Sequence, residues 1–415
     1  MAAQTRRFYG WPMAVVAWLL YGFGVMPFYS WGFLLPEMLA ELGLSRADGG
    51  LAFGVGVLCG GFASPWVGVA LTRYGTRKTM TVGYLLSAVA FLLLSRAQGL
   101  WSIILVYGVF STTVHAFATV LPTQNLASTW FLRYRARMLA FLLTASGVLA
   151  PVMFAVNAWL VQEASWRTGW VVIGVLQGIL GVVAWLVIRD SPESLGQLQD
   201  GARSQEELDA ARPKREVRDV DLWSAREAVR TPQFALMLLC GIGYAVPWYV
   251  LNNHSRLHLQ DLGFQVEAAA AILSIMALVS TAGRLSGAFG DFLSPPRLLG
   301  TALAVEAVGV VLFTYATTTA AAYTAVILIG LGFGAAYISQ AATFAQFFGR
   351  RAFATTTGIR FMVGALFTAT APWLAGWWYD TRGSYTAVFL GLAGVTALGA
   401  TIGWTIRSPR RPSTL

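Results

Sequence analysis

Long apolar runs separated by short polar stretches occupy almost the whole chain. A helix needs about 20 residues to cross the hydrocarbon core of a bilayer, because it rises about 1.5 Å per residue. The runs that reach this length predict twelve transmembrane helices, at residues 11–36, 48–72, 79–96, 100–130, 137–162, 167–189, 231–258, 267–291, 297–317, 320–348, 353–379 and 385–406. The pattern therefore predicts an all-α, polytopic membrane protein.

One long polar segment, from Asp190 to Arg230, interrupts this pattern and separates six predicted spans from six. We expect an N-terminal six-helix bundle at 1–189, a cytoplasmic linker at 190–230 and a C-terminal six-helix bundle at 231–415. The linker is rich in charged residues and proline, which favours extended chain. Residues 205–211 are the part of it that we expect to form a short surface helix.

Three short motifs recur in the two halves, at nearly the same separation along the chain. The pairs are Gly68–Lys78 with Gly287, Asp291 and Arg297; Trp130–Arg135 with Phe347–Arg351; and Arg167–Trp170 with Arg382–Tyr385. Structural repeats are typical of secondary transporters, which bind their substrate near the bilayer midplane at the repeat interface. The repeats thus predict two pseudo-symmetric bundles with a substrate site between them.

Composition supports a membrane protein and predicts neither a cofactor nor a metal. Hydrophobic residues make up 56% of the chain and charged residues only 12%, whereas soluble domains have about 25% charged residues. Cys59 and Cys240 both fall within apolar runs, and the three histidines show no metal-ligand spacing. Because no nucleophile–base pair or glycine-rich phosphate loop is present either, we do not expect an enzyme.

Basic residues predict the orientation of the chain. Most of the 29 Lys and Arg residues fall at one set of span ends, together with both termini, and such residues are enriched on the cytoplasmic side. Arg360 is assigned to that side, and Arg46, Arg256 and Arg382 to the outer side. We therefore expect a multi-pass protein of the bacterial inner membrane with both termini in the cytoplasm. The net charge of +10 follows from topology rather than from nucleic-acid binding, because the basic residues are dispersed over short loops.

Arg284 lies within the predicted span 267–291, where a charge costs about 2.5–3.5 kcal/mol or more. Its planar guanidinium suits a carboxylate ligand, because it donates two parallel hydrogen bonds. Two structural alternatives remain. Arg284 pairs with Glu306, which lies at similar depth in the next span, or it extends toward the cytoplasmic interface.

Other polar residues within spans suggest further contacts. Thr112, His115, Thr119 and Thr123 follow one face of span four at spacings of three and four. This stripe lines a cavity or forms interhelical hydrogen bonds, and His115 is either a substrate or proton contact or a structural residue. In span one, Phe28 and Tyr29 are candidates for the pocket wall. In contrast, His254, Arg256 and His258, at the end of span seven, are expected at the outer membrane interface, where charged residues are common.

The segment Gly68–Lys78 resembles the loop signature of the major facilitator superfamily, with Thr72 at the usual acidic position and Asp291 as the acid in the second half. In that family the loop acts as a conformational latch. The resemblance thus implies a latch made of Gly68, Arg73, Gly75, Arg77, Gly287 and Asp291.

A narrower resemblance covers nearly the whole chain. Four segments are similar to those of bacterial monocarboxylate porters and oxalate/formate antiporters: Phe8–Trp11, Leu44–Arg46, Trp130–Phe131 and Gly383–Tyr385. The resemblance implies that Arg284 binds the substrate carboxylate and that Tyr337 supplies an aromatic hydroxyl nearby, with interhelical packing as the alternative for Tyr337. From their places in spans ten and eleven, Gln340 and Phe361 are further candidates for the cavity. The resemblance places Ser280 where animal monocarboxylate transporters carry an aspartate, and Thr370 where oxalate carriers have a second cation, a lysine.

These observations lead to the hypothesis of a proton-coupled symporter for lactate-like or pyruvate-like monocarboxylates, acting as a monomer in the lipid bilayer. A single cation in the cavity favours a monoanion, because a dianion would leave one buried charge unpaired. The proton-carrying candidates are Arg284, Glu306 and His115. An organic-anion exchanger of the oxalate/formate type is the alternative, and a non-transporting organic-acid sensor is a more remote one.

Overall fold

The structure is a computed structural model that describes residues 8–211, 223–286 and 294–409. Within these residues the secondary structure is helical, without strands, and eleven helices are long and apolar enough to cross a bilayer. One of the eleven, α3 (Arg46–Leu94), has 49 residues, and Gly75 interrupts it with a φ of 81°. Since 49 residues suffice for two crossings, the described chain has the twelve predicted spans.

The first half of the chain begins with two helices that together form span one, α1 (Gly10–Gly24) and α2 (Met26–Leu42). The helices that follow α3 are α4 (Leu100–Ile103), η1 (Ile104–Ser111), α5 (Thr112–Ala116), α6 (Val120–Trp130), α7 (Arg135–Glu163) and α8 (Trp166–Val187). The second half contains α11 (Pro232–Asp261), α12 (Val266–Arg284), α13 (Pro295–Thr314), α14 (Thr319–Arg382) and α15 (Thr386–Thr405). Gly349, with a φ of 64°, divides the 64-residue α14 into two spans.

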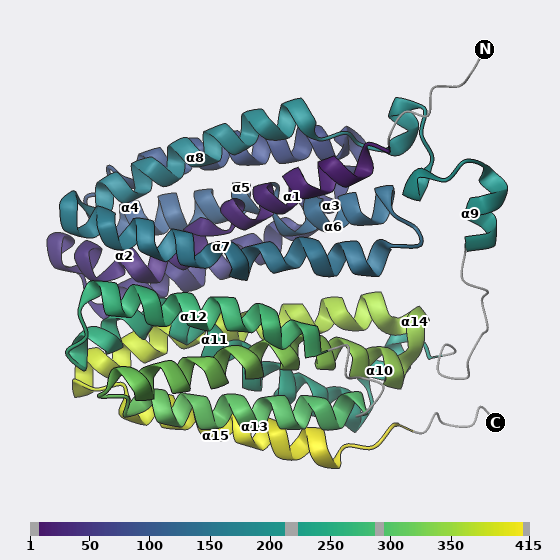
Figure 1. Ribbon diagram of the computed structural model, residues 1–415. Helices are drawn as coiled ribbons and strands as arrows, with labels where there is room; N and C mark the ends of the chain where they lie inside the picture. The colour runs from purple at the N-terminus through teal and green to yellow at the C-terminus, as the bar shows by residue number, and fades with distance from the viewer. Residues whose placement is uncertain (1–7, 212–222, 287–293, 410–415) are drawn as a thin grey trace. The chain divides into compact units, whose positions relative to one another are not determined.

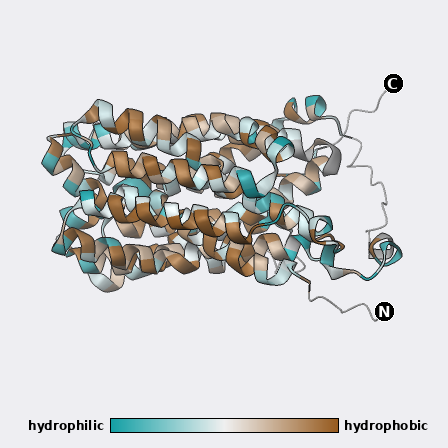
Figure 2. Ribbon diagram, turned by 90° about the horizontal axis from the view of Figure 1, so that it is seen from above, coloured by the Kyte–Doolittle hydropathy of each residue, from teal (hydrophilic) through white to brown (hydrophobic). Residues whose placement is uncertain are grey.

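Large apolar side chains remain exposed along the helices, among them Phe62, Trp66, Trp101 and Trp159. Figure 2 shows hydrophobic residues along the helices and hydrophilic residues gathered toward their ends. This distribution suits helices whose outer faces contact lipid.

Short helices occupy the polar segment between the halves: η2 (Pro192–Leu195), η3 (Gln199–Gly201), α9 (Gln205–Ala211) and α10 (Ala225–Val229). The short surface helix predicted at 205–211 is present as α9. Part of the segment is anchored to the first half, because the Asp200 carboxylate accepts hydrogen bonds from the backbone amides of Leu132 and Arg133.

Span four is not the continuous helix that the polar stripe requires. It is π-helical at Ile104–Ser111, α-helical at Thr112–Ala116, and breaks before Val120, where Thr119 has φ −108° and ψ −99°. The predicted single face therefore ends at His115. The Thr119 side chain favours this break. Its hydroxyl donates to the His115 carbonyl oxygen at 3.2 Å, so this oxygen keeps a hydrogen-bond partner where the helix is interrupted.

Contacts divide the chain into two compact units. Unit 1 comprises residues 1–28, 59–149 and 164–215, and unit 2 comprises residues 29–58, 150–163 and 216–415. In unit 1, a buried apolar core includes Met13, Leu20, Tyr84, Trp130 and Leu180. In unit 2, α13 packs on α14 and α15, and α12 and α11 pack on α14; Figure 1 shows these five helices side by side.

Candidate functional site

Glycines bring α12 and α14 into backbone contact at the site of Arg284. A Cβ atom at Gly334 would lie 2.1 Å from the Ser280 carbonyl oxygen and 2.9 Å from the Arg284 nitrogen. On the facing helix, a Cβ atom at Gly283 would lie 2.5 Å from the Leu331 oxygen. Small residues allow such close packing between membrane helices. The position of Arg284 is therefore fixed by the sequence of both helices.

Tyr337 lies one helical turn beyond Gly334, so its ring is beside Arg284. The guanidinium carbon of Arg284 is 5.7 Å from the centre of the Tyr337 ring, within the range of a cation–π interaction. Arg284 is also the last residue of α12, where the helix dipole favours a cation. The structure thus places Arg284 and Tyr337 together, as predicted.

A second group of polar side chains lies next to Tyr337. The Tyr244 ring stands edge-on to Tyr337, with 6.4 Å between ring centres. The Tyr244 hydroxyl donates to Gln340 Oε1 at 2.9 Å, and Gln340 Nε2 donates to the Met237 carbonyl oxygen at 2.7 Å. Gln340 therefore belongs to a hydrogen-bonded network in unit 2, and Tyr337 borders that network through its ring contact with Tyr244.

Arg360 completes this network and corrects the sequence analysis. Its Nη1 donates to the Tyr244 hydroxyl at 3.2 Å and to Gln340 Oε1. The residue is only 8% exposed, its Nε has no hydrogen-bond partner, and it forms no ion pair within the described residues. Arg360 is thus buried within α14, whereas the basic-residue count treated it as one of the cytoplasmic charges that report topology. The sequence signal for its burial is its position inside the predicted span 353–379.

Ser280 and Glu306, the two remaining candidates near Arg284, are both buried outside this hydrogen-bonded network. Ser280 is fully buried and donates its hydroxyl to the Ala277 carbonyl oxygen of its own helix at 2.7 Å. Glu306 is fully buried on α13 against Gly332 of α14, and neither of its carboxylate oxygens accepts a hydrogen bond within the described residues. The proposed hydrogen-bonded pair between Arg284 and Glu306 is thus not formed.

The other candidates from the sequence lie apart from this network or in the other unit. In unit 1, the His115 ring stands edge-on to Phe91 at 6.2 Å, and its Nδ1 has no hydrogen-bond partner within the described residues. Thr119 is buried beside it at the break in span four, and Phe28 is half-buried in the same unit. In unit 2, Tyr29 is buried against Phe154, and Phe361 is 53% exposed beneath the Arg360 guanidinium.

The polar end of span seven is enclosed by other parts of the protein. His254, Arg256 and His258 are at most 5% exposed, and their expected place at the outer interface stays a prediction. Arg256 forms a two-pronged ion pair with Glu37 and also donates to the Phe33 carbonyl oxygen. The sequence does not reveal this burial, because the covering residues come from span one, more than 200 positions earlier.

Comparison with known proteins identifies the family. A model of the Major Facilitator Superfamily matches residues 17–369. The chain belongs to this superfamily. Its fold agrees, since the nucleoside transporter NupG aligns with a TM-score of 0.74 at 15% identity, covering 94% of this chain and 98% of that one. A bacterial homolog of the human lysosomal transporter Spinster, in an inward-facing conformation, aligns with a TM-score of 0.70 at 16% identity, covering 96% and 94%.

Two curated relatives in this superfamily differ in their described roles. Monocarboxylate transporter 13 of Bos taurus is 26% identical over 388 residues, which cover 92% of this chain and 85% of the relative. The membrane sensor protein UhpC of Salmonella typhimurium is 25% identical over 293 residues, which cover 69% of this chain and 65% of the relative. The chain is thus similar to a transporter along nearly its whole length and to a sensor along two thirds of it.

The predicted superfamily latch is partly described, and its role stays a prediction. Gly287 and Asp291 lie outside the described residues, whereas Gly68, Arg73, Gly75 and Arg77 lie in unit 1. The Arg77 backbone amide donates to the Asp190 carboxylate at 2.8 Å, and Gly75 makes room for that carboxylate. Although Thr72 replaces the usual acid, Asp190, at the end of span six, thus supplies a carboxylate to this loop.

Proposed function

We propose that this superfamily member is a secondary transporter of small monocarboxylates such as lactate or pyruvate, coupled to protons and acting by alternating access. The observation that carries the proposal is the placement of Arg284 beside the Tyr337 ring. A guanidinium provides the charge and the two parallel donors that a carboxylate requires. The similarity to monocarboxylate transporter 13 over 92% of the chain supports the same substrate class.

Arg360 favours a second candidate, the exchange of dianions such as oxalate. A buried cation without an acidic partner is costly, and an anionic ligand removes that cost. Among the described residues, Arg360 bonds to neutral groups, and the Tyr244 and Tyr337 rings connect it to Arg284. The argument that a single cation favours a monoanion therefore applies only if Arg360 stays with its neutral partners during binding.

Uptake by proteoliposomes separates the two candidates. Labelled lactate, pyruvate and oxalate would be compared for the wild type, Arg284→Lys, Arg284→Gln and Arg360→Gln, with Arg382→Gln as an exposed-arginine control. Monocarboxylate transport predicts that both Arg284 variants fail and that Arg360→Gln keeps lactate uptake. Dianion exchange predicts oxalate exchange that both Arg284→Gln and Arg360→Gln abolish.

Two results would contradict the proposal. Normal monocarboxylate uptake by Arg284→Gln would exclude Arg284 as the carboxylate anchor. Binding of a carboxylate without any flux, measured on the same purified protein, would favour a sensor, the role in the name of the UhpC relative.

A further inference from the structure

One end of unit 2 is held together by segments from both halves of the sequence. Residues 29–58 and 150–163 of the first half group with 216–415 of the second half. The helix ends α2 (Leu42), α3 (Arg46), α11 (Asp261) and α14 (Arg382) lie at this end. The count of basic residues predicts that this is the outer end of the protein.

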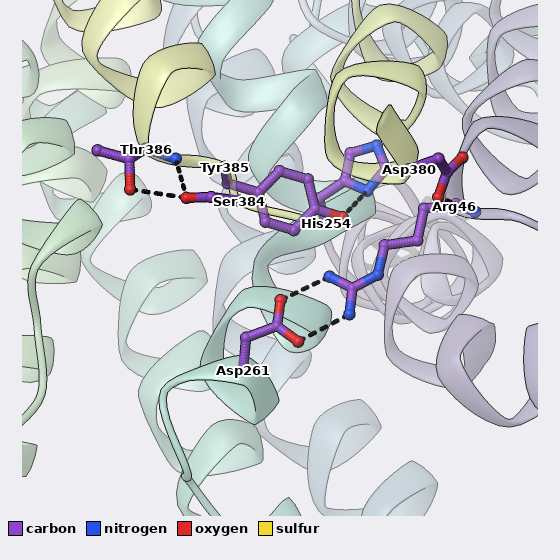
Figure 3. A network of polar contacts seen from close by, with 7 residues as sticks. All are labelled: Arg46, His254, Asp261, Asp380, Ser384, Tyr385 and Thr386. Carbon is purple, nitrogen blue, oxygen red and sulfur yellow. Dashed lines mark hydrogen bonds and ion pairs between the residues drawn. The ribbon is translucent and has the colours of Figure 1, made fainter. Parts of the chain in front are cut away.

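Arg46, the first residue of α3, contacts both α11 and α14 there (Figure 3). Its Nη1 and Nη2 donate to the two carboxylate oxygens of Asp261 at 2.6 and 2.7 Å. Its guanidinium carbon lies 3.5 Å from the centre of the Tyr379 ring. The side chain of Arg46 thus connects the first half of the chain to both α11 and α14.

The backbone of the same residue is bound by a second carboxylate. Asp380 of α14 accepts hydrogen bonds from the amides of Arg46 at 3.1 Å and Ala47 at 2.8 Å. These amides belong to the first turn of α3, whose partial positive charge favours an anion. Asp380 therefore caps a helix of the first half from a helix of the second half.

Directly next to this cluster, α3 and α14 touch through their backbones. A Cβ atom at Gly50 would lie 2.3 Å from the Pro372 oxygen, and one at Gly54 would lie 2.0 Å from the Ala369 oxygen. Such spacing leaves no passage between these two helices. His254 supports the α14 side, since its Nε2 bonds the Pro372 oxygen and its Nδ1 bonds the Tyr385 hydroxyl.

We propose that the contact of Arg46 with Asp261 and Asp380 is a lock that holds the outer end closed and must break before substrate enters from that side. The inference rests on the proposed transport function, because alternating access requires this end to open. The Arg46–Asp261 pair suits a reversible lock, since the two side chains are 17% and 29% exposed and water can solvate them when they separate. The Arg256–Glu37 pair, in which Arg256 is fully enclosed and Glu37 is 26% exposed, is the costlier of the two to break.

Charge reversal tests the lock through the accessibility of the α3–α14 contact. A cysteine at Ala369, which is 3% exposed, would be labelled with a membrane-impermeant maleimide, in a Cys59→Ser background. Arg46→Asp and Asp261→Arg should each raise the labelling rate, by up to about fivefold for the loss of one partly exposed ion pair. The double variant Arg46→Asp/Asp261→Arg should return the rate toward that of the parent.

The control is Arg382→Asp, which reverses an arginine at the same end whose side chain lies over the Trp378 ring. It should leave the labelling rate unchanged. Unchanged labelling in both single variants would overturn the proposal, and so would a double variant that labels as fast as either single one. Because labelling needs no transported substrate, a wrong substrate assignment would not affect the result.

Discussion

Among the described residues of unit 2, the three arginines Arg256, Arg284 and Arg360 lie within apolar spans and differ in their contacts. Arg256 has a carboxylate partner, Glu37, which marks a structural ion pair. Arg360 has neutral partners, and Arg284 lies beside an aromatic ring. A buried guanidinium whose partners among the described residues are neutral is costly, so Arg360 is a candidate for binding an anion. Arg284 is half-buried and is a candidate because it lies beside the Tyr337 ring.

The network around Arg360 predicts that Gln340→Leu destabilises the protein. The substitution removes the acceptor shared by Arg360 and Tyr244 and the donor to the Met237 oxygen. Leaving buried polar groups without partners costs about 1–3 kcal/mol. The melting temperature of the purified protein in detergent should fall accordingly.

Gln346→Leu is the matched control for this prediction, because Gln346 is an exposed glutamine of the same helix. We expect its melting temperature to stay near that of the wild type. Equal melting temperatures for the two variants would contradict a stabilising role of the network.

At the scale of helices, the contact between α12 and α14 depends on glycine. Gly334→Ala would place a methyl group 2.1 Å from a backbone oxygen of α12, so the helices must separate. Overpacking of this kind costs about 1–3 kcal/mol. We expect a lower melting temperature and, because Arg284 moves with α12, weaker lactate uptake.

Gly364→Ala provides the comparison, since a Cβ atom at Gly364 on the same helix meets nothing within 4 Å. This variant should be as stable as the wild type or slightly more stable, because alanine favours helices over glycine. A Gly334→Ala protein with wild-type melting and uptake would show that the helix contact is not needed to place Arg284.

Helices were predictable here to the extent that local pattern determines them. The length of the apolar runs predicted the spans, and the composition of the linker predicted its short helix at Gln205–Ala211. The break in span four was not predictable from spacing, because Thr119 keeps the helical periodicity while its backbone leaves the helix. The burial of His254 and Arg256 depends on residues distant in sequence, so the local polar pattern indicated an exposed end instead.

The candidate site was predictable only in part, for a similar reason. Arg284 was predictable because it is a charged residue in an apolar run. Tyr337 lies one helical turn after Gly334, the glycine that packs against the backbone of Arg284. The burial of Arg360 was not predicted, because Arg360 lies close to the basic segment Arg350–Arg351, where positive charge usually reports topology. Its neutral partners, Tyr244 and Gln340, come from two other spans and become visible only in the fold.

At the scale of the whole molecule, transport requires that binding at one site be coupled to movement of both halves. The proposed lock on Arg46 and the proposed anion site on Arg284 both belong to unit 2. Anion binding and closure of the outer end therefore involve the same packed helices α11, α12 and α14, which offers a physical route for coupling.

Glu306 is the residue that we expect to carry the proton in coupled transport. It is a fully buried carboxyl group whose oxygens accept no hydrogen bond within the described residues, so a proton can bind without displacing a partner. In proteoliposomes with acid outside, wild-type lactate uptake should exceed uptake without a pH gradient. Glu306→Gln keeps the size of the side chain but cannot carry a proton, so it should lose this acceleration while retaining lactate–lactate exchange.

Glu163→Gln, at an exposed position, is the control and should behave as the wild type. A Glu306→Gln protein that still responds to the gradient would move the proton to His115 or to the Arg284 network, and a wild type that ignores the gradient would favour anion exchange.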